Sequence, residues 1–137
     1  MQIIHRKGPQ REEAFTLIQL MVVVAILALL AVIAITNTLR ARITANNVMA
    51  QAALKTISTA VELYSLSSGS YPLSTSNLVT ATPPYLNRDY FAGTYSGFTF
   101  SSTLTASSYT IVATPAVMGR TGSTTYTITT GGVLQGN

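Results

Sequence analysis

The sequence contains no cysteine, a single histidine and only four acidic residues among its 137 positions. The lack of cysteine excludes disulfide bonds, thiolate catalysis and cysteine-ligated metal sites. His5 lies in the short N-terminal stretch, so no histidine in the body of the chain can activate a serine. These absences argue against an enzyme, and we expect neither a metal nor a cofactor.

Charge is also scarce, since Lys, Arg, Asp and Glu together make up 9% of the chain and its net charge is +4. Three basic residues lie close to the N-terminus: Arg6, Lys7 and Arg11. The other five are dispersed: Arg40, Arg42, Lys55, Arg88 and Arg120. They form no basic stripe with interleaved aromatic residues, which argues against nucleic-acid binding.

One long hydrophobic run dominates the sequence. Residues 15–35 are almost continuously apolar, interrupted only by Thr16 and Gln19, and no ionisable side chain occurs from Ala14 to Leu39. As a helix the run is about 32 Å long, which matches a hydrocarbon layer of about 30 Å. A small domain cannot surround such a helix on every side, so we predict a membrane-spanning segment over residues 15–39 rather than a buried core helix.

Residues 1–14 are short, polar and basic, and we interpret them as a leader on the cytoplasmic side. An ordinary secretory signal is the alternative. Its apolar region usually covers about 7–15 residues, fewer than in this run, although Val32-Ile33-Ala34 could imitate a small-residue cleavage site.

Beyond the apolar run, the chain remains compatible with a helix as far as about Leu66. Residues 40–66 are predicted to form an amphipathic half of the same helix. Weak helix formers just before it, at 36–38, and within it, at 46–47, favour bending or fraying. Its core-facing stripe has spacings of three and four: Ala50, Leu54, Ile57, Val61 and Tyr64. A second face is polar: Gln51, Lys55, Ser58 and Glu62.

The rest of the chain predicts a loop followed by strands. Residues 67–93 are rich in Ser, Gly and Pro, with Gly69 suited to a helix end and Pro72 unable to continue a helix. Scattered apolar residues are expected to hold this loop on the core: Leu73, Leu78, Val79, Tyr85 and Leu86. Residues 94–137 alternate as strands do, at 95–102, 109–114 and 125–129, which indicates successive antiparallel strands.

The segment AFTLIQLMVVVAILALLAVIAI resembles the N-terminal signature of type IV pilins and pseudopilins. The order of segments is similar too: a basic leader, an apolar helix with an amphipathic continuation, a loop with Tyr71-Pro72, and an antiparallel sheet. The head also resembles type II secretion pseudopilin heads in the segments ATPPYL, YTIVATPAV and TTYTITTGGVL. The resemblance implies an α+β fold in which a long N-terminal helix packs on a small antiparallel sheet.

The same resemblance implies a life cycle. A prepilin peptidase would cut between Ala14 and Phe15 and N-methylate Phe15, which leaves the apolar helix on the mature protein. The partners would be other pilin or pseudopilin subunits, the peptidase, the assembly machinery and the bacterial inner membrane, with the N-terminus cytoplasmic and the head extracytoplasmic. The subunit would then enter a pilus or pseudopilus.

Three positions depart from the family pattern. Ala14 replaces the usual glycine, and we expect slower cleavage. Gln19 replaces the usual glutamate, which family members pair with a neighbour's terminal amine during filament assembly; the neutral amide should pair more weakly. Thr36 lies near a place where proline is common, so the resemblance does not imply the kink that such a proline would impose here.

Three hypotheses from different classes follow. The first is a structural subunit of a type IV pilus-like or type II secretion pseudopilus filament, minor or divergent because Gln19 is neutral and the acidic calcium loop of major pseudopilins has no counterpart. The second is a membrane-anchored binding protein that recognises a surface, a secreted substrate or DNA. The third, a tethered enzyme, has no catalytic constellation to support it.

Overall fold

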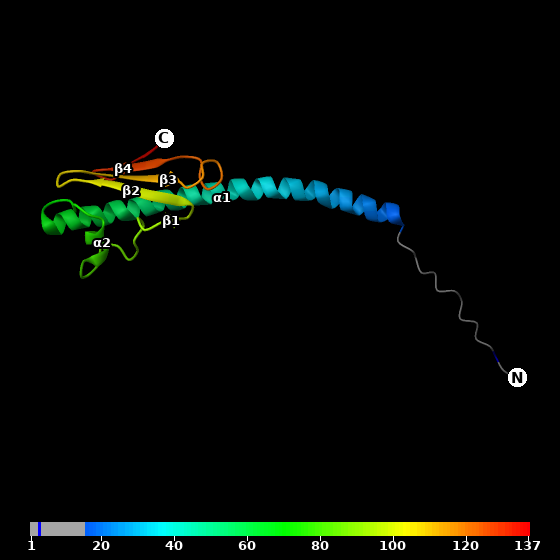
Figure 1. The fold of residues 1–137 in the computed structure, drawn as a ribbon, viewed down its shortest axis with the longest axis horizontal. Helices are drawn as coiled ribbons and strands as arrows, with labels where there is room; N and C mark the ends of the chain where they lie inside the picture. The colour runs from blue at the N-terminus through cyan, green and yellow to red at the C-terminus, as the bar shows by residue number, and fades with distance from the viewer. Residues whose placement is uncertain (1–2, 4–15) are drawn as a thin grey trace. The chain divides into compact units, whose positions relative to one another are not determined.

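In a computed structural model, which describes Ile3 and residues 16–137, a long helix precedes a small antiparallel sheet (Figure 1). Helix α1 (Leu17–Ser68) has 52 residues. The chain divides into two compact units, Met1–Asn37 and Thr38–Asn137, and α1 continues from the first into the second. The second unit is called the head below. The predicted α+β class, with a long N-terminal helix packed on an antiparallel sheet, is confirmed.

Helix α1 is continuous through 36–38 and 46–47, where the sequence favoured bending. At Thr36 the side-chain hydroxyl donates to the Ile33 carbonyl over 3.0 Å, so this poor helix former bonds within the helix. The helix ends at Ser68 because Gly69 adopts a left-handed conformation with φ of 77°, while its amide still donates to the Ser65 carbonyl. It is therefore two residues longer than predicted.

The sheet contains five strands in sequence order, each antiparallel to the next. They are β1 (Thr94–Tyr95), β2 (Phe98–Leu104), β3 (Tyr109–Pro115), β4 (Tyr126–Thr129) and β5 (Val133–Gly136).

One strand prediction is wrong, because residues 95–102 do not form a single strand. Tyr95 pairs with Phe98 across a two-residue turn in which Ser96 and Gly97 have φ values of 48° and 77°. Positive φ at both central residues is the geometry of the tight turn that best joins twisted antiparallel strands. The segment therefore folds back on itself as a hairpin.

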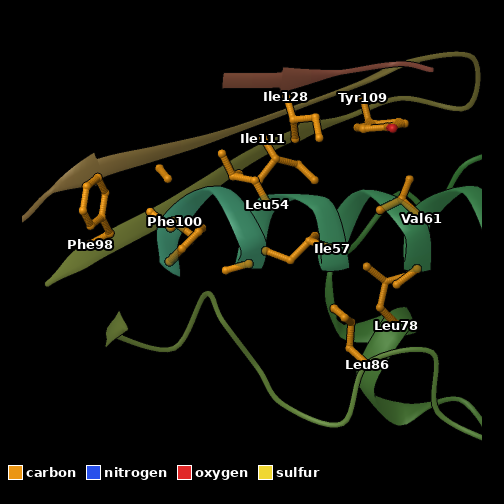
Figure 2. Close-up of a cluster of buried hydrophobic side chains, with 14 residues drawn as sticks. Leu54, Ile57, Val61, Leu78, Leu86, Phe98, Phe100, Tyr109, Ile111 and Ile128 are labelled. Atoms are coloured by element: carbon orange, nitrogen blue, oxygen red, sulfur yellow. The ribbon is translucent and has the colours of Figure 1, made fainter. Parts of the chain in front are cut away.

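The core lies between one face of α1 and the inner face of the sheet (Figure 2). Ala50, Leu54, Ile57 and Val61 are each 0% exposed, and Tyr64 is partly buried against the same cluster. The sheet contributes alternate residues of its strands: Phe98, Phe100, Tyr109, Ile111, Ala113 and Ile128. Each fully buried Leu, Ile or Phe contributes about 1.5–3 kcal/mol, so this contact holds the head together.

The loop between α1 and β1 contains a short helix, α2 (Ser76–Thr80), that the sequence did not indicate. Leu78 and Leu86 are buried and joined, since the amides of Tyr85 and Leu86 both donate to the Leu78 carbonyl. Val79 and Tyr85 are partly buried. Leu73, in contrast, is 72% exposed. The preceding Pro72 is buried instead, and neighbouring side chains of a non-helical segment point to opposite sides.

Candidate functional site

The first half of α1 exposes its apolar side chains on every side. All residues from Leu17 to Arg42 are exposed, and exposure is 79% at Leu17 and 42% at Leu39. A soluble protein rarely exposes a contiguous apolar patch larger than a few hundred Å². This part of α1 is long and apolar enough to cross a membrane and is not buried within the protein. It is therefore compatible with a membrane anchor.

A capping box closes the N-terminal end of this helix. The amide and the hydroxyl of Thr16 both donate to Gln19 Oε1, at 3.1 and 3.0 Å, and the Gln19 amide lies 3.4 Å from Thr16 Oγ1. A Thr followed three residues later by Gln supplies this reciprocal pairing, which satisfies helix amides that have no intrahelical partner. The predicted assembly residue Gln19 thus uses its side-chain oxygen within its own chain.

Ala14 and Phe15, the predicted cleavage and methylation positions, lie outside the described residues. The described helix begins two residues beyond Phe15. A chain that started at Phe15 would carry its terminal amine next to the Thr16–Gln19 capping box.

An uncharged outer face runs along the head portion of α1, opposite the buried stripe. Its residues recur at spacings of three and four and are all exposed: Ala41, Ala45, Val48, Ala52, Thr56, Thr59, Leu63 and Leu66. Thr56 and Thr59 donate their hydroxyls to the carbonyls of Ala52 and Lys55, each over 2.9 Å, so these polar groups are already bonded within the helix. We call these eight residues the outer stripe.

The outer stripe was missed by the sequence interpretation, which followed only the buried stripe. Its signal is present in the sequence, because the three- and four-residue spacing and the lack of charge are both visible there. Of the two uncharged stripes, the sheet covers the one that the sequence predicted to face the core, from Ala50 to Tyr64.

Two asparagines hold the β3–β4 loop on α1. Asn46 Nδ2 donates to the Thr121 carbonyl over 2.8 Å. Asn47 donates to Ser123 Oγ over 2.8 Å and accepts from the Ser123 amide over 3.2 Å. Asn46 and Asn47 therefore form a polar clamp between the helix and the loop.

Glu62 links α1 to three other segments. Its Oε1 accepts from the Tyr109 hydroxyl at 2.9 Å and from the Gly131 amide at 3.1 Å, and its Oε2 accepts from the Tyr71 hydroxyl at 3.1 Å. Ser58, assigned by the sequence to a polar face, is buried and lies 2.7 Å from the Tyr109 hydroxyl. Two residues of the predicted polar face, Ser58 and Glu62, are thus part of the contact with the sheet, where tyrosine hydroxyls satisfy their polar groups.

This network shifts the two tyrosines in the same direction. Burial, followed by the hydrogen bond and charge of Glu62, raises the pKa of Tyr109, although the bond from Ser58 lowers it in part. Burial and then Glu62 also raise the pKa of Tyr71. Both hydroxyls therefore remain protonated donors in neutral solution, which suits a structural connection rather than proton transfer.

Among the described residues, no group of three His, Asp or Glu side chains lies close enough together to hold a metal ion. The predicted absence of a metal and a cofactor stays a prediction. No protein-family model matches the chain, and none of the curated proteins matches it. The exposed apolar first half of α1 and the outer stripe are therefore the features of this chain that bear on its function.

Proposed function

We propose that this protein is a type IV pilin-like subunit, inserted in a membrane by the first half of α1 and packed in a filament along the same helix. The observation that carries this proposal is the outer stripe. A simple membrane anchor needs an exposed apolar surface only across the bilayer. In this chain an uncharged face continues from Ala41 to Leu66, well beyond the apolar run.

The exposed surface of α1 can be covered first by lipid and later by neighbouring helices, and the second state buries more apolar area. Lipid covers residues 17–39 at no cost while the subunit is in the membrane, and it leaves the outer stripe in water. Neighbouring helices in a filament would cover both surfaces, with a gain of about 25 cal/mol for each Å² of apolar area removed from water. The small residues Ala41, Ala45 and Ala52 would let a second helix approach closely.

The finer assignment concerns processing and location. In this proposal a prepilin peptidase removes residues 1–14 and methylates Phe15, and the head lies on the extracytoplasmic side of a bacterial inner membrane. The subunit is a minor or divergent one of a pilus or secretion pseudopilus. Support for a minor role comes from Gln19, whose neutral side chain is bonded to Thr16 and offers no charge to a neighbour.

Processing is tested by the intact mass and N-terminal sequence of the protein made with a prepilin peptidase. We expect a start at N-methylated Phe15, and faster cleavage of Ala14→Gly because the smaller residue restores the family pattern. A start just after Ala34 would identify an ordinary secreted protein and refute the proposal.

Assembly is tested by disulfide cross-linking, which is clean because the chain has no cysteine. Val48→Cys places a thiol on the outer stripe, where Val48 is 59% exposed. Thr103→Cys places the control thiol on an exposed position of β2. In filament-forming cells, Val48→Cys is expressed together with a second variant that has a cysteine at another position of the outer stripe, and the two should cross-link. In the control, Thr103→Cys replaces Val48→Cys, and no cross-link should form.

The alternative, a membrane-anchored binding protein, predicts a different cross-linking result. Such a protein would remain a monomer in the bilayer, and neither thiol would form cross-links between copies above the level set by random collision.

A further inference from the structure

The β3–β4 loop (residues 116–125) presents apolar side chains to solvent at one end of the head. Val117 is 52% exposed and Met118 is 60% exposed, and Arg120 beside them is exposed as well. Exposed loop tips are usually small and polar. The exposed pair Val117 and Met118, with Arg120 beside it, is therefore a candidate contact surface.

Hydrogen bonds within this loop and from α1 fix its conformation and position. Within it, the Thr121 amide donates to the Val117 carbonyl over 2.9 Å, and the Gly119 amide donates to the Gly122 carbonyl over 2.7 Å. The Asn46 and Asn47 side chains fasten it to α1. A Cβ atom at Gly122 would overlap the ring of the buried Phe98, so the glycine seats the loop on the core.

The loop lies at the end of the head from which α1 runs back toward residue 38 (Figure 1). Asn46 follows Leu39 by seven residues, or about 10 Å along a helix. The polar layer of a bilayer is about 5–8 Å deep on each side. If the hydrocarbon layer ends near Leu39, the level of Asn46 lies a few Å beyond the polar layer, a distance that an extended methionine or arginine side chain can span.

The ionisable side chains at this end carry charge of one sign. Arg40 and Arg42 on α1 and Arg120 on the loop are all exposed. Three segments meet at this end, residues 38–47, the hairpin at 94–98 and residues 116–125, and none of them contains an acidic residue. In the head the acidic side chains are Glu62, bonded to Tyr71 and Tyr109, and Asp89, bonded to the Phe91 amide. This end is therefore complementary to an anionic surface.

We infer that the β3–β4 loop is a lipid-contact site: Val117 and Met118 insert among the headgroups, and Arg120 joins Arg40 and Arg42 on lipid phosphates. This inference rests on the membrane stage of the proposed function. The loop seats the head on an anionic bilayer, and the contact must break before the subunit leaves the membrane. Each basic residue near an anionic surface favours the seated state by about fivefold.

The test uses the full chain in vesicles, with an environment-sensitive fluorophore on single cysteines. The site probe is Met118→Cys, the distant control is Ser107→Cys in the β2–β3 turn, and Val24→Cys reports the apolar segment. In vesicles with anionic lipid, we expect blue-shifted emission from Met118→Cys and quenching by headgroup-level spin labels. The Ser107→Cys probe should report water.

The charge contribution is tested with a matched pair. In the Met118→Cys protein, Arg120→Ala should lower the ratio of lipid-contacting to water-exposed probe about fivefold. Lys55→Ala removes the same charge on α1, sixteen residues beyond Leu39 and about 24 Å along the helix, and should leave the ratio unchanged. An equal ratio in vesicles of purely zwitterionic lipid would overturn the electrostatic part.

Failure of this inference and failure of the proposed function give different results. A lipid-embedded Val24→Cys probe with a water-exposed Met118→Cys probe overturns the lipid contact and leaves the anchor intact. A water-exposed Val24→Cys probe overturns both. If the Met118→Cys probe is shielded only at high protein-to-lipid ratios, the loop contacts a second copy, and the lipid contact is refuted.

Discussion

The Tyr109 hydroxyl donates to Glu62 Oε1 over 2.9 Å and joins the sheet to α1 across 47 residues of sequence. Glu62 also accepts from Tyr71 and Gly131, so one carboxylate connects the helix, the loop after it, strand β3 and the β4–β5 turn. A carboxylate bonded in this way contributes more than a neutral acceptor would, because hydrogen bonds to charged groups are the stronger ones.

Replacing Tyr109 with Phe should lower the free energy of unfolding by about 1–3 kcal/mol, since Glu62 loses a donor and Ser58 loses its partner. Urea denaturation at neutral pH measures this change. Ser58→Ala is the control: it removes the second bond and keeps the phenol, so it should cost less than Tyr109→Phe. Equal costs would assign the effect to Ser58 rather than to Glu62.

Alkaline pH should weaken the head, and Tyr109→Phe should reduce that weakening. Because the folded state raises the pKa of Tyr109, it retains the proton more strongly than the unfolded chain does. The resulting stability is present in full below the unfolded pKa of about 10 and is lost as the pH rises through the raised folded pKa. Unfolding free energies measured on both sides of pH 10 test this; parallel pH profiles for the two proteins would contradict it.

Leu54→Ala should cost about 2–5 kcal/mol, a large part of the stability of a small domain, because Leu54 is 0% exposed at the centre of the core. Leu63→Ala is the matched control on the same helix, where the side chain is 50% exposed, and surface substitutions usually change stability by less than about 0.5 kcal/mol. Denaturation midpoints of the two variants should therefore separate clearly. Similar midpoints would contradict the burial of Leu54, and a lower midpoint for Leu63→Ala would mean that the sheet covers the outer stripe instead.

Gly122→Ala should destabilise the head by about 1–3 kcal/mol, since the new methyl group would displace the Phe98 ring from a packed site. The matched variant Phe98→Leu makes room beside Gly122, so Gly122→Ala should cost less in that background than in the wild-type protein. A double-mutant cycle measures the difference. Additive effects would show that the loop is not seated on Phe98.

The strongly periodic parts of the fold could be predicted from the sequence. The buried stripe from Ala50 to Val61 and the alternation of Tyr109, Ile111 and Ala113 each follow from the repeat of one element. Gly69 marked the end of α1 because glycine, which has no Cβ, adopts the left-handed conformation of a helix end without steric cost.

The remaining features depend on contacts between distant segments. Asn46 and Asn47 are poor helix formers by propensity, yet they remain in α1 because Thr121 and Ser123 bond to them. Glu62 lies on the polar face of α1 by its position in the sequence. It becomes part of the interior network only because the Tyr71 and Tyr109 hydroxyls donate to it. Pattern alone does not identify such partners. The Ser96–Gly97 turn and the Thr16–Gln19 capping box, in contrast, are local signals that were present and overlooked.

The last prediction concerns Gln19, where capping and assembly depend on the same side chain. Gln19→Glu keeps an acceptor for Thr16 and adds a negative charge at a helix N-terminus, which the helix dipole favours. The variant should therefore retain its capped helix and gain attraction for the terminal amine of a neighbouring subunit. Gln19→Leu, of similar size, should lose both the cap and the attraction.

Filaments in the native host, counted and analysed for subunit composition, measure the effect. If charge limits entry, incorporation should follow the order Glu, then Gln, then Leu at position 19. Thr16→Val separates the two roles, because it removes the hydroxyl from the capping box and leaves the charge at position 19 unchanged. A fall with Thr16→Val as large as that with Gln19→Leu would assign position 19 to capping alone. If the unmodified protein already forms the bulk of the filaments, the minor-subunit proposal fails, and packing along the outer stripe must suffice without the charge.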